Sequence, residues 1–336
     1  MTRRVPELSL AQYTQGSAAD RIAFERALFA GLQDYGFIIL ADHGVAETLL
    51  DAAYAMAQQF FAQDSAVKAA CNGGLRGYTP FGTEHAKDHA VPDLTEFYSV
   101  GREPAPETDG ETVGEMDGEM DGEMSGELYP EHYPPNVWPV APPRLREVFS
   151  ALYSALDGAG QQLLAALEPA LQLPAGWFAT RCVAGNSVLR VIHYPPVGAG
   201  VAPGAVRSAA HEDINLLTLL VAARGGGLQL LDRDGTWLPV ETEPRNLIVD
   251  SGDMLARLTN GVIPATTHRV VNPGGEFANI ANASRYSMPF FLHPTNTTSL
   301  AALPSCVTAE RPLRHPPTTA GDYLDERLRE IGLKRR

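Results

Sequence analysis

The feature of this sequence that most constrains its fold is a series of short apolar segments between residues 186 and 292, separated by frequent turns. The segments are rich in Val, Leu and Ile and are bounded by Gly, Pro, Asn or Asp, which is typical of β-strands. The expected strands occupy residues 186–192, 208–221, 227–231, 237–240, 246–249, 255–257, 267–271 and 286–292, with a hairpin turn at residues 232–235. Because no helical pattern separates them, we predict an antiparallel sandwich or jelly roll.

Helical periodicity is found on both sides of this strand-rich region. A first helix is expected to begin at the capping sequence of residues 17–20 and to end at Gly36. A buried strand over residues 37–40 follows, and then a second amphipathic helix. A long helix over residues 144–171 has the apolar stripe of a helix that backs a sheet, and a shorter helix from Asp322 should pack over the barrel.

These patterns divide the 336 residues into five regions. We expect an N-terminal region of helices and strands at 1–105, an acidic loop at 106–131, a linker and backing helix at 132–180, a jelly-roll core at 181–298, and a C-terminal segment with a helix at 299–336. The expected fold class is therefore mainly β with flanking helices.

The net charge of −14 is concentrated in one segment. Eleven acidic residues and no Lys or Arg lie between Glu103 and Glu131, so the rest of the chain carries only −3. From Gly110 this segment repeats GEMD and its variants, a Gly-rich pattern that cannot bury apolar surface. We expect an exposed or disordered loop there rather than a calcium site. Because the body of the chain is nearly neutral, we do not expect nucleic acid as a partner.

The cysteines and the apolar pattern bear on the location of the protein. Nothing near Met1 has the apolar core of a signal peptide, and no apolar run is long enough to cross a bilayer. Cys71, Cys182 and Cys306 match neither a disulfide framework nor a paired metal motif, so we expect buried, reduced thiols. The expected protein is cytoplasmic and binds no membrane, and the sequence is compatible with a monomer.

The candidate metal ligands are His211 and Asp213, in the run HEDINLLTLL, and His268, in THRVV. Residues i and i+2 of a strand share a face, so His211 and Asp213 are expected to point the same way and Glu212 to the other side. Two imidazoles and one carboxylate form a facial triad that suits Fe(II) and leaves coordination positions open. His43 has the side chain of a ligand but lies in a distant turn, where a local hydrogen-bonding role is expected.

A candidate carboxylate clamp lies near the end of the strand-rich region, where Arg285 and Ser287 alternate onto one face of a strand. An Arg beside a hydroxyl can hold a carboxylate by charge-assisted hydrogen bonds. Triad and clamp together predict a metal site with a place for an organic acid beside it.

These motifs resemble the iron(II)- and 2-oxoglutarate-dependent dioxygenases, in the branch that includes isopenicillin N synthase and the plant flavonoid and hormone oxygenases. The resemblance extends over nearly the whole chain, from DYGFIILADHGV through RVIHYPP, HEDINLLTLL, GGLQLLDRDGTWLPV, DSGDML and THRVVNP to RYSMPFF. It implies a double-stranded β-helix (jelly roll) core in which His211, Asp213 and His268 hold Fe(II).

The same resemblance implies that Arg285, Ser287 and Tyr194, the tyrosine before Pro-Pro, bind 2-oxoglutarate. Many plant members have an Asn where this chain has Ile192, so one contact to the acid is expected to be missing. The implied reaction uses O2 and couples decarboxylation of 2-oxoglutarate to hydroxylation, desaturation or ring closure of a small polar organic substrate. The candidate substrate contacts are Arg76, Tyr78, Arg190 and His193.

Three alternatives remain open from the residues alone. The first is an oxidase like isopenicillin N synthase, which uses no 2-oxoglutarate and binds its substrate's own carboxylate at the Arg-Ser pair. The second is a zinc hydrolase, since zinc also binds His and Asp, although Glu212 is badly placed for its general base. The third is a non-catalytic binding protein, against which the complete set of ligands and clamp residues argues.

Overall fold

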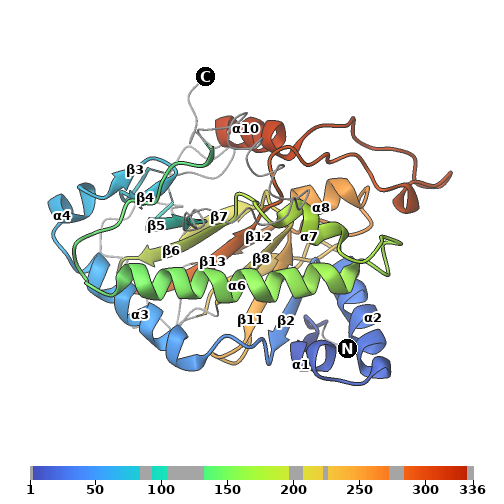
Figure 1. The fold of residues 1–336 in the computed structure, drawn as a ribbon, viewed down its shortest axis with the longest axis horizontal. Helices are drawn as coiled ribbons and strands as arrows, with labels where there is room; N and C mark the ends of the chain where they lie inside the picture. The colour runs from blue at the N-terminus through green and yellow to red at the C-terminus, as the bar shows by residue number, and fades with distance from the viewer. Residues whose placement is uncertain are drawn as a thin grey trace, which may run out of the picture.

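Two β-sheets form the centre of the computed structural model, which describes residues 3–83, 93–103, 132–196, 207–221, 226–271 and 284–330. Among these residues, the larger sheet has nine strands and the smaller sheet has four (Figure 1). Helices flank the larger sheet, so the predicted fold class, mainly β with flanking helices, is confirmed. The acidic segment at 106–131 lies outside the described residues.

The larger sheet joins strands of the N-terminal region to strands of the predicted core. Its order is β1 (Glu7–Ser9), β2 (Phe37–Ala41), β11 (Leu247–Ser251), β8 (Leu217–Val221), β13 (Arg285–Leu292), β6 (Val188–Tyr194), β5 (Glu96–Gly101), β4 (Arg76–Thr79) and β3 (Asn72–Gly73). The pairs are antiparallel except β1 with β2, which are parallel. The smaller sheet is antiparallel, in the order β10 (Trp237–Pro239), β9 (Leu228–Leu231), β12 (His268–Val270) and β7 (Ser208–His211).

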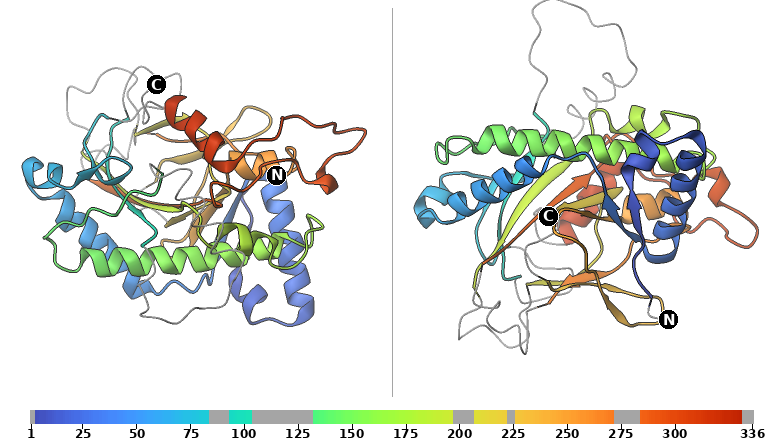
Figure 2. Two further views of the ribbon diagram at one scale, coloured as in Figure 1. Left: turned by 45° about the horizontal axis from the view of Figure 1, so that its top comes forward. Right: turned by 90° about the horizontal axis from the view of Figure 1, so that it is seen from below.

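Three long helices pack on the side of the larger sheet that faces away from the smaller sheet (Figure 2). They are α2 (Ala18–Tyr35), α3 (Glu47–Phe61) and α6 (Leu145–Leu167). The shorter helices are α1 (Leu10–Thr14), α4 (Ser65–Ala69), α7 (Trp177–Cys182), α8 (Asp253–Leu258), α10 (Ala320–Glu330) and the 3-10 helix η3 (Pro304–Cys306). None of the described helices has both the length and the apolar character needed to span a bilayer.

The predicted ends of α2 are confirmed by its hydrogen bonds. Ser17 Oγ accepts a hydrogen bond from Asp20 N at 3.3 Å, and the Asp20 carboxylate accepts one from Ser17 N at 2.9 Å. Gly36 follows the helix in the left-handed conformation, with φ of +67°. Its N–H donates to Leu32 O at 2.8 Å, so the chain can turn directly into β2.

The apolar stripe predicted for α6 is also confirmed. The apolar residues that form the stripe are buried: Leu145, Val148, Phe149, Leu152, Leu156 and Leu163. The helix ends at Leu167 rather than at residue 171, because Pro169 cannot donate a backbone hydrogen bond to continue it. The hairpin predicted at residues 232–235 connects β9 to β10, and the three cysteines are buried and unpaired as expected.

The prediction of a strand at 255–257 is wrong, because these residues belong to helix α8. Met254, Leu255 and Leu258 are buried at helical spacing, and Gly252 with Asp253 forms an acidic helix start that the strand interpretation overlooked. The first N–H groups of α8 donate to carbonyl groups of the loop after β7, with Asp253 N 2.7 Å from Asp213 O. The helix therefore supports that loop.

A buried cluster of polar groups lies on the helix-covered side of the larger sheet. The Glu96 carboxylate on β5 accepts hydrogen bonds from Lys68 Nζ at 2.7 Å, from the Tyr78 hydroxyl and from His193 Nδ1 at 2.8 Å. Burial alone would raise the pKa of the Glu96 carboxyl, but these contacts with His193, Lys68 and Tyr78 outweigh burial and lower it to about 2. Ionised Glu96 therefore links α4 and β4 to His193 of β6 through side-chain contacts.

Replacing Glu96 by Gln should lower the melting temperature, and the loss should depend on pH. A carboxyl whose pKa is lower in the folded than in the unfolded protein adds stability above its unfolded pKa and loses that contribution as pH falls. The difference between wild type and Glu96→Gln should therefore be full at neutral pH and shrink as the pH falls from the ordinary value of 4.5 toward about 2.

The matched control is Glu147→Gln, which removes an exposed carboxylate paired with Arg144 on α6. This variant should change the melting temperature little at any pH, because exposed ion pairs contribute little. A Glu96→Gln difference that stays constant over the acidic range would contradict the ionised cluster.

Candidate functional site

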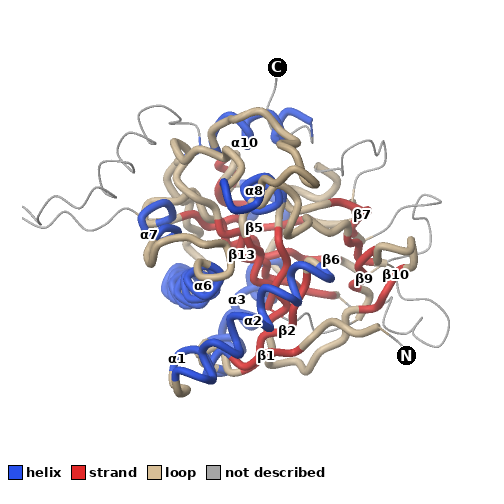
Figure 3. Tube along the Cα trace, turned by 90° about the vertical axis from the view of Figure 1, so that its right-hand side faces the viewer, coloured by secondary structure: helices blue, strands red, loops and turns tan. Residues whose placement is uncertain are grey.

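A cavity of about 480 Å³ lies between the two sheets, within the usual size range of small-molecule sites. Alternate residues of β6 and β13 line it, because alternate residues of a strand point to the same side. On β6 these are Val188, Arg190, Ile192 and Tyr194, and along β13 they are Arg285, Ser287, Pro289, Phe291 and, just beyond the strand, His293. Helix α10 borders the cavity with Leu324 and Leu328, at the same end of the sheets as α8 (Figure 3).

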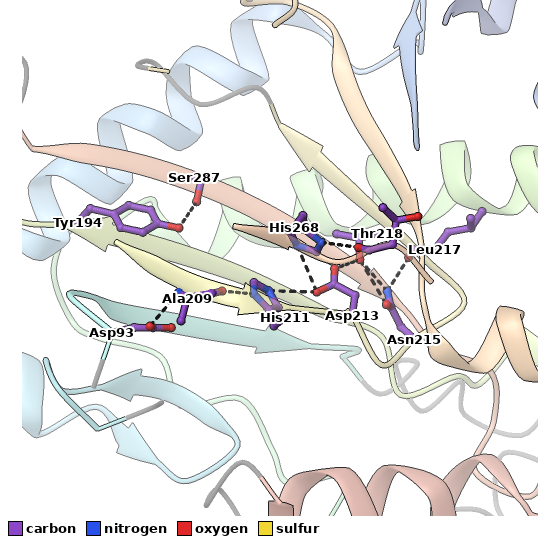
Figure 4. A network of polar contacts seen from close by, with 11 residues as sticks. Asp93, Tyr194, Ala209, His211, Asp213, Asn215, Leu217, Thr218, His268 and Ser287 are labelled. Carbon is purple, nitrogen blue, oxygen red and sulfur yellow. Dashed lines mark hydrogen bonds and ion pairs between the residues drawn. The ribbon is translucent and has the colours of Figure 1, made fainter. Parts of the chain in front are cut away.

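Three candidate metal ligands meet inside this cavity (Figure 4). His211 ends β7 and lies directly opposite His268 of β12 in the antiparallel register. Asp213 Oδ1 lies 3.6 Å from His211 Nε2 and 3.8 Å from His268 Nε2. The ligand atoms all lie within 4.8 Å of one another, so one metal ion can contact the three of them.

Hydrogen bonds to backbone carbonyls orient both imidazole rings. His211 Nδ1 lies 2.8 Å from Ala209 O, and His268 Nδ1 lies 3.1 Å from Thr266 O. A carbonyl oxygen can only accept, so each Nδ1 carries a proton, and Nε2 is the nitrogen left to bind a metal. Asp93, which also lines the cavity, accepts a hydrogen bond from Ala209 N at 3.1 Å and holds this part of β7.

Asp213 reaches the site from a loop and not from a strand. Strand β7 ends at His211, so the predicted alternation of His211 and Asp213 along one strand is wrong, although both side chains converge. The Thr218 hydroxyl donates to Asp213 Oδ2, and Asn215 Nδ2 donates to Thr218 Oγ1 at 3.1 Å. These bonds leave Oδ1 directed at the two histidines. The expectation that Glu212 points away from the site is also wrong: Glu212 is exposed and borders the cavity, where it accepts a hydrogen bond from Thr267 at 2.9 Å.

The three groups are electrostatically linked, and a metal would have to displace the proton that Asp213 favours on His211. Burial disfavours the charged form of His211, but the hydrogen bond and charge of Asp213 outweigh it and raise the pKa to about 9. Burial and the charge of His211 lower the pKa of His268 to about 4. Burial opposes ionisation of Asp213, but the hydrogen bond from His211 and both imidazoles hold its pKa well below the ordinary value. The carboxylate thus remains an anionic ligand, and the donor set of two nitrogens and one oxygen fits Fe(II).

The candidate clamp lies in the same cavity. Arg285 of β13 is directly opposite Tyr194 of β6 in the register, and its guanidinium carbon lies 4.6 Å from the tyrosine ring. The Ser287 hydroxyl donates to the Tyr194 hydroxyl at 3.4 Å. Nε and Nη1 of Arg285 are buried without a hydrogen-bond partner among the described residues. A buried guanidinium with unused donors beside two hydroxyls fits a bound carboxylate.

The four candidate substrate contacts separate into two pairs. Arg76 and Arg190 line the cavity, whereas Tyr78 and His193 are not among the described residues that line it and instead bind Glu96. Arg76 and Tyr78 leave β4 on opposite sides because Gly77 between them has a φ of +76°. A Cβ at Gly77 would also lie 2.1 Å from Cys71 O, so another residue does not fit there.

Two polar residues near the candidate metal ligands, Asp250 and Thr218, were not predicted from the sequence. Asp250 of β11 also lines the cavity, and burial and the nearby Asp213 carboxylate raise its pKa well above the ordinary value. The patterns predicted neither Asp250 nor Thr218, because both look like ordinary strand residues.

The local role expected for His43 is confirmed, since its Nε2 donates to Arg245 O at 2.7 Å and its Nδ1 accepts from Val45 N at 3.1 Å.

Comparisons with known proteins agree with this geometry. The family described as the 2OG-Fe(II) oxygenase superfamily matches residues 185–294, and the family described as the N-terminal region of a non-haem dioxygenase in morphine synthesis matches residues 5–141. The 2-oxoglutarate-dependent dioxygenase ucsF from Acremonium sp. is 30% identical over 96% of this chain and 98% of its own length. The 2-oxoglutarate-Fe(II) type oxidoreductase ppzD from Metarhizium majus is 28% identical over 97% of this chain and 95% of its own length.

A solved structure extends the agreement to three dimensions. A crystal structure of a 2OG-Fe(II) oxygenase family protein from Caulobacter crescentus has a TM-score of 0.81 and 40% sequence identity. The match covers 98% of this chain and 100% of the other.

Replacing Thr218 by Val should weaken metal binding by about tenfold or more, because the Asp213 carboxylate would lose the hydrogen bond that orients it. Anaerobic titration of the metal-free protein with Fe(II) measures the affinity. Thr218→Ser, which keeps the hydroxyl, is the control and should bind nearly as well as wild type. Unchanged affinity in a folded Thr218→Val protein would show that Thr218 does not orient the ligand.

Proposed function

The chain belongs to the 2OG-Fe(II) oxygenase superfamily, and on that premise we propose a role for each polar group of its cavity. Its relatives are oxidoreductases and dioxygenases that depend on 2-oxoglutarate, so this protein is an enzyme that uses Fe(II), 2-oxoglutarate and O2. The observation that carries the proposed roles is the presence, in one cavity, of the His-Asp-His cluster and of buried Arg285, two of whose nitrogens have no hydrogen-bond partner in the described part of the chain.

His211, Asp213 and His268 are the proposed iron ligands. Each directs one ligand atom to the same point, and the hydrogen bonds of Ala209, Thr266 and Thr218 hold these atoms in place. When bound, Fe(II) supplies the positions at which 2-oxoglutarate and O2 react, with decarboxylation of the acid coupled to oxidation of the substrate. Holding three ligands on one side keeps the opposite positions open for these molecules.

Arg285, Ser287 and Tyr194 are the proposed clamp for the carboxylate of 2-oxoglutarate that lies farther from the iron. The guanidinium offers paired N–H donors and a permanent charge, and the two hydroxyls add neutral donors beside it. Ile192 lines the wall between the clamp and Arg190, so at that position the acid meets an alkyl group instead of a further polar contact.

The rest of the cavity shields the reaction from water and positions a second molecule. Apolar side chains of both sheets and of α10 cover the space, including Phe97, Phe291, Leu324 and Leu328. We propose that a small organic substrate binds there, next to the iron ligands, and is hydroxylated, desaturated or cyclised. The three buried, unpaired cysteines also support our proposal of a cytoplasmic location.

Of the alternatives, the 2-oxoglutarate-independent oxidase makes the sharpest contrast. In that case the unused donors of Arg285 would receive the substrate's own carboxylate. The relatives depend on 2-oxoglutarate, which favours the cosubstrate as the occupant of the clamp. Because these relatives are oxidoreductases and dioxygenases, they do not favour a zinc hydrolase or a non-catalytic scaffold.

Arg285→Ala should raise the 2-oxoglutarate concentration needed for half-maximal turnover by roughly thirtyfold or more, the effect of removing one member of a buried charge pair. Iron binding should be unchanged, because the clamp shares no ligand with the metal. Succinate release at increasing 2-oxoglutarate measures the first effect, and anaerobic Fe(II) titration measures the second. Arg285→Lys should recover only part of the affinity, because it lacks the planar fork.

Asp213→Ala is the complementary variant and should abolish iron binding while the protein stays folded. Full activity of purified Asp213→Ala would refute the ligand assignment. Substrate-dependent O2 consumption by wild type in the complete absence of 2-oxoglutarate would refute the clamp assignment, because the clamp would then belong to the substrate.

A further inference from the structure

We propose that the substrate carries a carboxylate, which binds to Arg76 and Arg190 at the part of the cavity away from the Arg285 clamp. This inference rests on the proposed function, since it assumes that the clamp is occupied by 2-oxoglutarate. It adds a substrate class, small organic acids, and assigns two residues that select for them.

The two arginines lie away from the clamp along the cavity wall. Tyr194, opposite Arg285, and Arg190 are four residues apart on β6, which corresponds to roughly 13 Å along a strand. The four carbon–carbon bonds of 2-oxoglutarate, each about 1.5 Å long, span at most about 6 Å. A 2-oxoglutarate molecule held by Arg285 therefore leaves Arg190 and Arg76 to a second molecule.

Arg76 is a buried cation whose hydrogen bonds go to neutral acceptors. It is 3% exposed. Its guanidinium donates to Asn186 Oδ1 at 2.7 Å, to Leu75 O at 3.2 Å and to His132 O at 3.4 Å. No carboxylate among the described residues forms an ion pair with it, and its Nε has no hydrogen-bond partner among them. Burial lowers the pKa of Arg76 to about 10, so the group still carries its charge at neutral pH. An uncompensated buried charge is costly, and an anionic ligand would offset that cost.

The absence of a side chain at Gly101 leaves room for this guanidinium. A Cβ at Gly101 of β5 would lie 2.0 Å from Arg76 Nε and 2.5 Å from its Cζ, so the arginine occupies the space that a side chain would take. Asn136 fixes Gly101 from the edge, because its amide group exchanges hydrogen bonds with Gly101 N at 2.7 Å and Gly101 O at 2.9 Å. Arg76 is therefore held in one orientation beside the cavity.

Arg190 supplies the second positive charge and lies beside two aromatic rings. Its guanidinium carbon lies 4.2 Å from the centre of the Phe97 ring and 5.5 Å from that of the Phe291 ring. Arg190 is close enough to Arg76 for its charge to lower the pKa of Arg76. Two like charges kept near each other in a cavity favour an anion between them, and the aromatic rings favour an apolar body attached to it.

The test uses matched pairs of a carboxylate and its primary amide, which have nearly the same shape but differ in charge. The probes are phenylacetate with phenylacetamide and 3-phenylpropionate with 3-phenylpropionamide. Binding is measured by calorimetry on the full-length protein loaded with Fe(II) and saturated with 2-oxoglutarate under anaerobic conditions, so that the clamp is already filled. At least one acid should bind about tenfold or more tightly than its amide, the effect of one charge-assisted hydrogen bond.

Arg190→Gln and Arg76→Gln should each remove most of this preference by weakening the acid and leaving the amide nearly unchanged. Gly101→Ala should have the same effect, because it displaces the Arg76 guanidinium without removing it. Arg26→Gln, on the exposed side of α2, is the matched control and should keep the full preference. Melting curves identify any variant that does not fold, and the folded variants among the three then decide the outcome.

The proposal is overturned if no acid of the series binds more tightly than its amide, or if the preference survives in the folded variants. Failure of the proposed function would look different, because no visible charge-transfer band would form on adding 2-oxoglutarate to the Fe(II) protein. An acid preference that depends on Arg76 and Arg190 without that band would support the subsite and refute the proposed clamp occupant.

Discussion

The pairing of β7 with β12 is the interaction on which the centre of this enzyme depends. Only in the observed antiparallel register does His268 lie opposite His211, with the two ring centres 4.4 Å apart. A slip by one residue would turn every side chain of β12 to the other face and would remove one proposed ligand from the cavity. The geometry of the metal site is thus determined by backbone hydrogen bonds between segments that are distant in the sequence.

Carboxyl groups and arginines lie in different parts of the cavity. Carboxyl groups gather around the histidines, with Asp213 ionised and Asp250 of β11 beside it, while Arg285, Arg190 and Arg76 lie on β13, β6 and β4. A divalent cation and an organic acid can therefore occupy neighbouring positions in a space of about 480 Å³. Each sign of charge attracts a different reactant: the carboxyl groups favour the metal cation, and the arginines favour organic acids.

Sequence patterns predicted much of this structure because many of its elements have local signals. The capping residues of α2, the stripe of α6, the hairpin at residues 232–235 and the alternation of Arg285 with Ser287 are all encoded by neighbours in the chain. The errors arose where tertiary contacts decide the conformation. Helix α8 is stabilised by carbonyl groups of a separate loop, and the left-handed Gly77 sends Tyr78 away from Arg76. The contribution of Thr218 and Asp250 depends on sheet pairing, for which a single sequence carries no local signal.

The support of the Asp213 loop by α8 has a consequence for how such an enzyme can diversify. The loop from Glu212 to Leu216 is held by backbone donors of Gly252, Asp253 and Met254, so its conformation depends little on the identity of the side chains around the substrate. The opposite wall is built from side chains of β4, β5, β6 and α10, which can be exchanged one at a time. The support of the proposed iron ligands is thereby independent of the proposed substrate wall. A substitution in that wall can change which molecules fit without moving the loop that carries Asp213.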